Sequence, residues 1–229
     1  MEKKVIFVMI ILWNPFMSYY RIKEEKMNIT KIVITGGPCG GKSTAMDKIK
    51  ERFSQKGYKV LIIHETATEL ISGGIAPWTC GTNLDYQKCQ MKLQMEKEAL
   101  IEKAARTMEE ARVLIVCDRG TMDNKAYLSE QDFTSLLTYI GMTEEELYKE
   151  YAAVFHLVTA ADGAEQFYTT ANNSSRIETP KEAIAVDKRL RNAWEGHPHL
   201  TVIENTSDFE TKISTLLSEM EFFLDNNRK

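Results

Sequence analysis

The 229-residue sequence contains no hydrophobic run long enough to cross a lipid bilayer. Its longest apolar run near the N-terminus, from Val5 to Trp13, has nine residues, whereas a membrane-spanning helix needs about 20. Two lysines precede this run as in a signal peptide, but no small-residue cleavage site follows it. Residues 1–26 therefore form an N-terminal extension with three alternative interpretations: an over-extended gene start with Met27 as the natural first residue, a membrane-surface anchor, or a signal.

The sequence also lacks an excess of positive charge. The chain has 29 Lys and Arg against 33 Asp and Glu, a formal net charge of -4 and a pI of about 5.7. Such an acidic surface does not attract a polyanion. We therefore expect no nucleic-acid partner, and beyond residues 1–26 we expect no membrane contact. The sequence does not indicate an oligomeric state.

Cysteine motifs are missing as well. The four cysteines form no C-x-x-C pair and no zinc-binding spacing, and no pair of histidines has it either. Isolated cysteines of this kind are typical of free thiols in a reducing compartment, so the sequence predicts a cytoplasmic protein. The four residues are Cys39, Cys80, Cys89 and Cys117.

What the sequence does contain is a regular alternation of short apolar runs and longer helical patterns. The runs show no polar alternation, which is typical of strands buried on both faces of a parallel sheet. Five such strands with helical connections predict one α/β domain over residues 27–229, with helices on both faces of the sheet. The predicted strands are Ile32–Ile34, Val60–Ile63, Val113–Cys117, Val154–Val158 and Leu200–Ile203.

The helical patterns fall between these runs and after the last one. In the second of them, a stripe of five residues is predicted to face the core: Leu93, Leu100, Ile101, Ala104 and Met108. The segment from Ala160 to Pro180 is polar and predicts a mobile loop. The predicted helices are Lys42–Phe53, Leu84–Met108, Gln131–Tyr151 with a break near Gly141, Lys181–Trp194 and Asp208–Leu224.

A glycine-rich stretch joins the first strand to the first helix and matches the pattern G-x-x-x-x-G-K-[ST]. Glycines let successive backbone N–H groups point at one anion, and the helix N-terminus adds partial positive charge. The pattern predicts that this phosphate loop binds the triphosphate of ATP or GTP. The predicted nucleotide-binding residues are Gly36, Gly37, Pro38, Cys39, Gly40, Gly41, Lys42, Ser43 and Thr44.

Polar residues follow two of the predicted strands, at the edge where parallel sheets bind ligands. Lys42 is predicted to reach the β- and γ-phosphates, and Ser43 with Asp118 to hold Mg²⁺. Glu65 is predicted to accept a proton from an attacking hydroxyl or water, and Arg119 to stabilise charge on the transferred phosphoryl group. The alternatives are a structural ion pair for Asp118 and Arg119, and an acidic first helical turn for Glu65.

Basic residues are also frequent in the polar loop and the helix that follows it. In phosphoryl-transfer enzymes a lid in this position brings arginines over the phosphates. Arg176 lies in the polar loop itself and is the predicted catalytic residue of such a lid. The alternative is that these charges are simply solvated.

These motifs resemble those of P-loop kinases, and more closely the P-loop domain shared by TRPL translocation defect proteins and the nicotinamide riboside kinase part of NadR. The resemblance implies a three-layer fold with a sheet order of 2-3-1-4-5 and places Arg176 in the lid. It leaves the acceptor open. The matching stretches are Thr35–Thr44, Glu65–Thr68, Asp118–Asp123, Phe167–Glu178 and Trp194–Phe209.

Three functions are compatible with these residues. The first is a Mg²⁺-dependent kinase that transfers a phosphoryl group from ATP to a small, nucleoside-like acceptor lying under Ser72–Trp78, a loop with an aromatic platform. The second is an ATP- or GTP-dependent switch or hydrolase that acts on a protein partner, although the spacing around Asp118 differs from that of small G-proteins. The third is a binding protein without turnover, which the intact set of Lys42, Ser43 and Asp118 disfavours.

Overall fold

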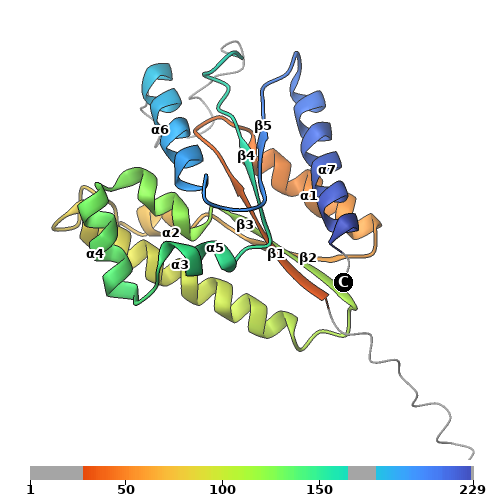
Figure 1. Ribbon diagram of the computed structural model, residues 1–229, viewed down its shortest axis with the longest axis horizontal. Coiled ribbons are helices and arrows are strands. Elements are labelled where there is room, and N and C mark those ends of the chain that lie inside the picture. Colours follow the sequence, from red (N-terminus) through yellow and green to blue (C-terminus); the bar gives the residue numbers. More distant parts are fainter. Residues whose placement is uncertain (1–27, 165–178, 228–229) are drawn as a thin grey trace, which may run out of the picture.

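The computed structural model describes residues 28–164 and 179–227, and its centre is a five-stranded sheet (Figure 1). All neighbouring strands are parallel, and their spatial order is β2-β3-β1-β4-β5. Both the parallel sheet and this order confirm the sequence prediction. The strands are β1 (Asn28–Thr35), β2 (Lys59–Ile63), β3 (Arg112–Asp118), β4 (Ala153–Leu157) and β5 (Leu200–Ile203).

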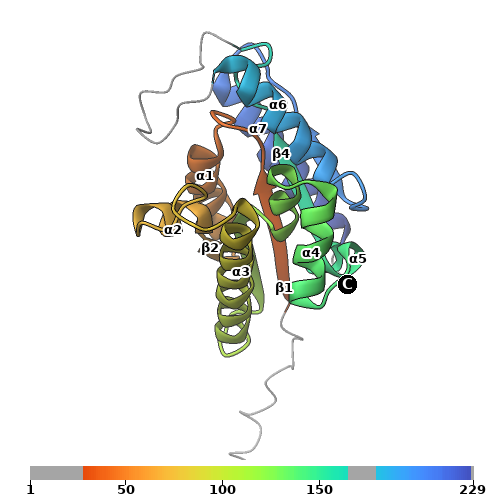
Figure 2. The ribbon, with the colours of Figure 1, turned by 90° about the vertical axis from the view of Figure 1, so that its left-hand side faces the viewer.

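Helices cover both faces of the sheet and complete three layers. The helices α1 (Lys42–Gln55) and α7 (Phe209–Asn226) pack against one face. The opposite face is covered by α3 (Asn83–Ala105), α4 (Glu130–Ile140), α5 (Glu144–Lys149) and α6 (Pro180–Ala193), and Figure 2 shows α3 and α4 side by side. Two short elements follow strand ends: α2 (Thr66–Ser72) and the 3-10 helix η2 (Thr121–Tyr127).

Two predicted features lie outside the described residues: the N-terminal extension at 1–26, and Arg176 with its lid. Within the described ranges, no helix combines the length and the apolar composition that a bilayer crossing requires. The break predicted near Gly141 is present, because Gly141 ends α4 in the left-handed conformation with φ 70°. The 3-10 helix η2 was not predicted from the sequence.

The core stripe predicted for the long second helix, which is α3, is wrong in part: Ile101 packs against the core, and Leu93 and Met108 are half-buried, but the other two residues are not buried. In α3, Leu100 is 63% exposed and Ala104 is also exposed. The face that α3 turns inward is largely polar, because it covers buried polar groups of the sheet and of the connection after β3. Its buried polar residues are Gln87, Gln90, Gln94 and Glu98.

A buried lysine explains part of this polar face. The Nζ atom of Lys31 in β1 lies 3.0 Å from Glu98, 2.6 Å from Glu102 and 3.2 Å from Glu150. Burial alone would lower the pKa of Lys31, but the surrounding carboxylates raise it above its ordinary value. The hydroxyl of Tyr151 also donates to Oε1 of Glu98 at 2.9 Å. The sheet and α3 are therefore joined by a buried ionic cluster.

Lys31→Met should strongly destabilise the fold. The substitution leaves Glu98 buried without its cation, and breaking a buried pair in this way costs about 3–5 kcal/mol. Urea unfolding of the full chain measures the loss. Lys149→Met is the matched control, since Lys149 and Glu145 form an exposed pair, and it should leave the midpoint unchanged. Equal midpoints for the two variants would contradict the account of this cluster.

Candidate functional site

The predicted phosphate loop connects β1 to α1 at the carboxyl edge of the sheet. Its backbone takes the left-handed region at Gly36 (φ 132°), Cys39 (φ 56°) and Gly41 (φ 92°). A side chain at Gly36 would place its Cβ 2.0 Å from the carbonyl oxygen of Leu157, so only glycine fits there. No side chain of the described residues caps α1, and its first turn contains no acidic residue. This helix N-terminus is therefore suited to an anionic ligand.

Lys42 is the first residue of α1 and bends back over the loop. Its Nζ atom donates to the carbonyl oxygens of Gly36 at 2.8 Å and Gly37 at 2.9 Å. The side chain is buried, whereas the neighbouring Ser43 and Thr44 are exposed. A lysine held this way lies beside the N–H groups of the loop and can exchange its carbonyl partners for phosphate oxygens.

Glu65 lies directly before α2, two residues after the end of β2. Its Oε1 accepts a hydrogen bond from Nε of Arg119 at 3.1 Å, and its Oε2 accepts one from the Thr68 hydroxyl at 2.6 Å. Burial would raise the pKa of Glu65, but Arg119 and Lys42 outweigh it and lower the pKa to about 2. The carboxylate is therefore ionised at neutral pH.

Asp118 is the last residue of β3 and pairs in register with Ile34 of β1, just before the phosphate loop. Burial raises the pKa of Asp118 above its ordinary value, and Lys42 opposes this shift. Its Oδ1 is buried and accepts no hydrogen bond from the described residues. An unsatisfied carboxylate oxygen is costly unless a cation or water completes it, so Asp118 fits a site for Mg²⁺.

Few other groups near Asp118 would contribute to a metal site. Within residues 28–164 and 179–227, no group of three or more His, Cys, Asp or Glu is arranged to hold a metal ion. Mg²⁺ is usually bound by one or two protein oxygens, with waters and phosphates completing its octahedron. The exposed hydroxyl of Ser43 and the carboxylate of Asp118 match that pattern.

Arg119 turns away from open solvent and joins three parts of the site. Its backbone has a φ of 78°, which is uncommon for a residue with a side chain. Besides its bond to Glu65, its Nη1 donates to the carbonyl oxygen of Gly36 at 2.8 Å and lies 3.8 Å from Oδ2 of Asp123. Among the described residues, the ion-pair partners of Arg119 are therefore Glu65 and Asp123, and not the Asp118 of the sequence-based alternative.

The structure adds two buried carboxylates that the sequence did not single out as site residues. Asp123 in η2 accepts hydrogen bonds from Thr35 Oγ1 at 2.8 Å and from Trp194 Nε1 at 2.6 Å. Asp187 in α6 accepts one from the backbone N–H of Gly37 at 2.6 Å. For Asp187 the only available signal was an acidic residue among the many charges of a helix.

The loop predicted to cover an acceptor carries exposed apolar side chains. Trp78 is 72% exposed and Ile75 is 43% exposed. Nearby on α3, the buried hydroxyl of Tyr86 has no hydrogen-bond partner among the described residues. Burial and then the charge of Glu65 raise the pKa of Tyr86 to about 12. The connection between α2 and α3 therefore exposes apolar side chains, and the charge of Glu65 acts on Tyr86 at the start of α3.

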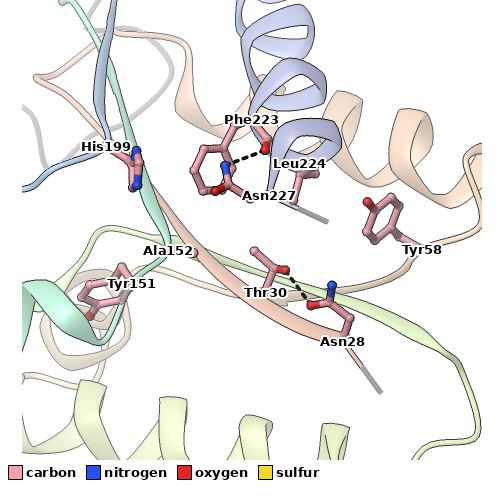
Figure 3. Close-up of a pocket in the computed structure, with 9 residues that line it drawn as sticks. All are labelled: Asn28, Thr30, Tyr58, Tyr151, Ala152, His199, Phe223, Leu224 and Asn227. Atoms are coloured by element: carbon pink, nitrogen blue, oxygen red, sulfur yellow. Dashed lines mark hydrogen bonds between the residues drawn. The ribbon is translucent and has the colours of Figure 1, made fainter. Parts of the chain in front are cut away.

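A separate cavity lies at the other end of the sheet (Figure 3). Its volume is about 330 Å³, and none of the described side chains that line it is an acid, a lysine or an arginine. It lies at the amino ends of the strands, so it is not part of the site at their carboxyl ends. The lining residues are Asn28, Thr30, Tyr58, Tyr151, Ala152, His199, Phe223, Leu224 and Asn227.

A family model described as an AAA domain matches residues 31–212, which is well over half of the chain. The matched region runs from β1 into α7 and includes the whole phosphate loop. No curated protein matches the chain.

Proposed function

The chain belongs to this AAA-domain family and is a P-loop nucleotide-binding domain, and from that premise we propose that it is a Mg²⁺-dependent phosphotransferase. ATP is the proposed donor, with GTP as the alternative, and a small nucleoside-like molecule is the proposed acceptor. The observation that carries the proposal is the position of Glu65. Its ionised carboxylate lies at the sheet edge beside the phosphate loop, within the electrostatic influence of Lys42 and Arg119.

The phosphate loop supplies the binding part of this function. In the proposed complex, the N–H groups at the start of α1 contact the phosphates, and Lys42 leaves its two carbonyl partners to reach the β- and γ-phosphates. Ser43 and Asp118 would hold Mg²⁺, which would neutralise charge on the phosphates when bound. Asp118 would thereby gain the partner that its buried Oδ1 lacks among the described residues.

Glu65 supplies the catalytic part. A carboxylate with a pKa of about 2 is a weak base, so it would not remove the acceptor's proton before the reaction. Phosphoryl transfer depends more on the orientation of the acceptor than on its full deprotonation. We therefore assign Glu65 to orienting the acceptor hydroxyl and taking its proton as the new bond forms.

Arg119 has two proposed contributions. It orients Glu65 through its Nε atom, and it places positive charge near the phosphate loop. The second contribution is the charge stabilisation predicted from the sequence, and it remains a prediction. Arg176 is proposed as a further cation over the phosphates on the basis of its position in the sequence alone.

A second function has its own supporting observation. Trp78 and Ile75 expose apolar surface on the connection between α2 and α3, and exposed apolar patches often bind other proteins. A nucleotide-dependent switch or hydrolase could present this surface to a protein partner. In that case water, rather than a bound hydroxyl, would be oriented by Glu65.

Thermal unfolding of the full chain distinguishes these functions. Mg-ATP, Mg-GTP and candidate nucleosides are added singly and in pairs, because a ligand that binds the folded state raises the melting temperature. A phosphotransferase should show a further shift when a nucleoside is added to a non-hydrolysable ATP analogue. A shift with the triphosphate alone, and none with any nucleoside, would favour the switch. No shift with either triphosphate would contradict both functions.

A further inference from the structure

A single peptide bond in the phosphate loop is held from both of its ends. Its carbonyl oxygen, that of Gly36, accepts hydrogen bonds from Lys42 Nζ at 2.8 Å and Arg119 Nη1 at 2.8 Å. Its N–H, that of Gly37, donates to Oδ1 of Asp187 at 2.6 Å. Gly36 has a φ of 132° and no side chain to restrict rotation, so these contacts fix the orientation of the peptide.

Asp187 makes two further contacts besides its bond to Gly37. Its Oδ1 also accepts from the backbone N–H of Thr159 at 3.3 Å, and Nε2 of His156 lies 3.2 Å away. Burial would raise the pKa of Asp187, but His156 and the two backbone N–H groups lower it overall. A Cβ at Gly37 would lie 2.7 Å from Oδ1, so the close approach requires glycine there.

The proposed function requires Lys42 to leave this peptide. When Lys42 moves to the phosphates, its bonds to Gly36 and Gly37 are lost, and of the contacts seen among residues 28–164 and 179–227, those from Arg119 and Asp187 still hold the peptide. Because Asp187 comes from α6 and Arg119 follows β3, the two groups approach from elements far apart in the sequence. The phosphate loop would then keep its shape without help from its own lysine.

We propose that Asp187 is a positioning residue for nucleotide binding: it locks the Gly36–Gly37 peptide, opposite Arg119, so that the loop stays open to phosphate after Lys42 is released. This inference rests on the proposed function, since it assumes that the loop binds a triphosphate. It assigns to α6 a direct role in the shape of the phosphate loop. Thr159 supports the same arrangement by donating from Oγ1 to the carbonyl oxygen of Pro38 at 2.5 Å.

The direction in which Mg-ATP affinity changes when Asp187 is removed distinguishes a positioning role from a purely electrostatic one. A carboxylate near the loop repels phosphate, so if Asp187 acted only through its charge, its removal would tighten the binding of Mg-ATP. If Asp187 positions the loop, its removal weakens binding. Loss of one hydrogen bond to a charged group corresponds to a weakening of about tenfold or more.

The test compares full-length variants by calorimetric titration with Mg-ATP. Asp187→Ala should weaken binding about tenfold, and Asp187→Asn should weaken it less, because the carboxamide oxygen can still accept from Gly37. Glu146→Gln is the control, since Glu146 accepts a backbone N–H of Thr143 in the capping box of α5, away from the loop. The amide proton of Gly37 should move upfield in the NMR spectrum of Asp187→Asn, while other loop amides stay in place.

Two failures can be told apart. A parent chain that binds no nucleotide would contradict the proposed function, and the inference with it. A parent that binds, alongside an Asp187→Ala or Asp187→Asn chain that is folded and binds equally well or more tightly, would overturn the inference alone. If Asp187→Ala does not fold, Asp187→Asn and the Gly37 amide shift decide the question.

Discussion

Lys42→Ala is expected to abolish measurable binding of Mg-ATP and any turnover. The side chain supplies the only positive charge that the phosphate motif itself contributes. Removing one partner from a buried, hydrogen-bonded charge pair costs about 2–5 kcal/mol, which corresponds to a weakening of about 30-fold or more. Equilibrium titration of the full chain with Mg-ATP measures this loss directly.

The fold should survive this substitution. Lys42 bonds two carbonyl oxygens of the loop, but Gly36 keeps its bond from Arg119. Lys48→Ala is the control, because Lys48 lies on the exposed side of the same helix and pairs only loosely with Glu51, at 3.8 Å. Its nucleotide affinity should equal that of the parent. If the Lys42→Ala chain binds and reacts like the parent, the phosphate loop is not the nucleotide-binding site.

Glu65→Gln is expected to keep nucleotide binding and to slow phosphoryl transfer by about 100- to 10,000-fold, the usual contribution of a positioned proton acceptor. The carboxamide has the same shape and can still accept from Arg119, but it cannot take a proton. The measurement is the rate of transfer at saturating ATP, with the acceptor found in the thermal screen. Unchanged Kd values for the nucleotide would show that the site is intact.

Glu69→Gln is the control for this variant. Glu69 lies one turn further along α2 and pairs with Lys97 at 2.7 Å on the surface. Its transfer rate should match that of the parent. Since the pKa of Glu65 is lowered from 4.5 to about 2, the residue stays ionised far below neutral pH. Protonation of Glu65 should therefore cause no fall in the parent's transfer rate between about pH 8 and pH 5, the pH range in which ordinary histidines titrate. An equal rate for Glu65→Gln would exclude the residue from the mechanism.

Much of the fold could be predicted because its signals are local. Continuous Val, Ile and Leu runs identify strands that are buried on both faces, and the runs at Ile32, Val60 and Val113 lie in β1, β2 and β3. The phosphate motif is equally local, because its glycines, lysine and hydroxyl follow one another in the chain. The carboxyl edge of the sheet then brings Glu65 and Asp118 toward the same loop.

The inner face of α3 could not be predicted in the same way. Pattern analysis assumes that the buried face of a helix is apolar, but Gln94 and Glu98 are buried while Leu100 is exposed. These polar groups have partners distant in the sequence: Gln94 donates from Nε2 to the carbonyl oxygen of Arg119, and Glu98 pairs with Lys31. A single helix pattern contains no information about such partners.

Asp187 was missed for a related reason. It lies 150 residues from Gly37 in the sequence, and its contact depends on how α6 packs against the phosphate loop. The contacts of Arg119 could not be predicted either. Its position after β3 is evident from the sequence, but the direction of its guanidinium group is not. The direction of its side chain depends on the left-handed backbone at Arg119 and on the contacts with Glu65 and Gly36, which only the folded chain brings together.

The central claim is that this phosphate loop binds a nucleoside triphosphate through Lys42. Calorimetric titration of the full chain with Mg-ATP and with Mg-GTP, repeated on Lys42→Ala, tests it most directly. The account predicts saturable binding of at least one triphosphate to the parent and none to the variant at the same concentrations. Absence of binding to the parent for both triphosphates, or equal binding to parent and variant, would contradict it.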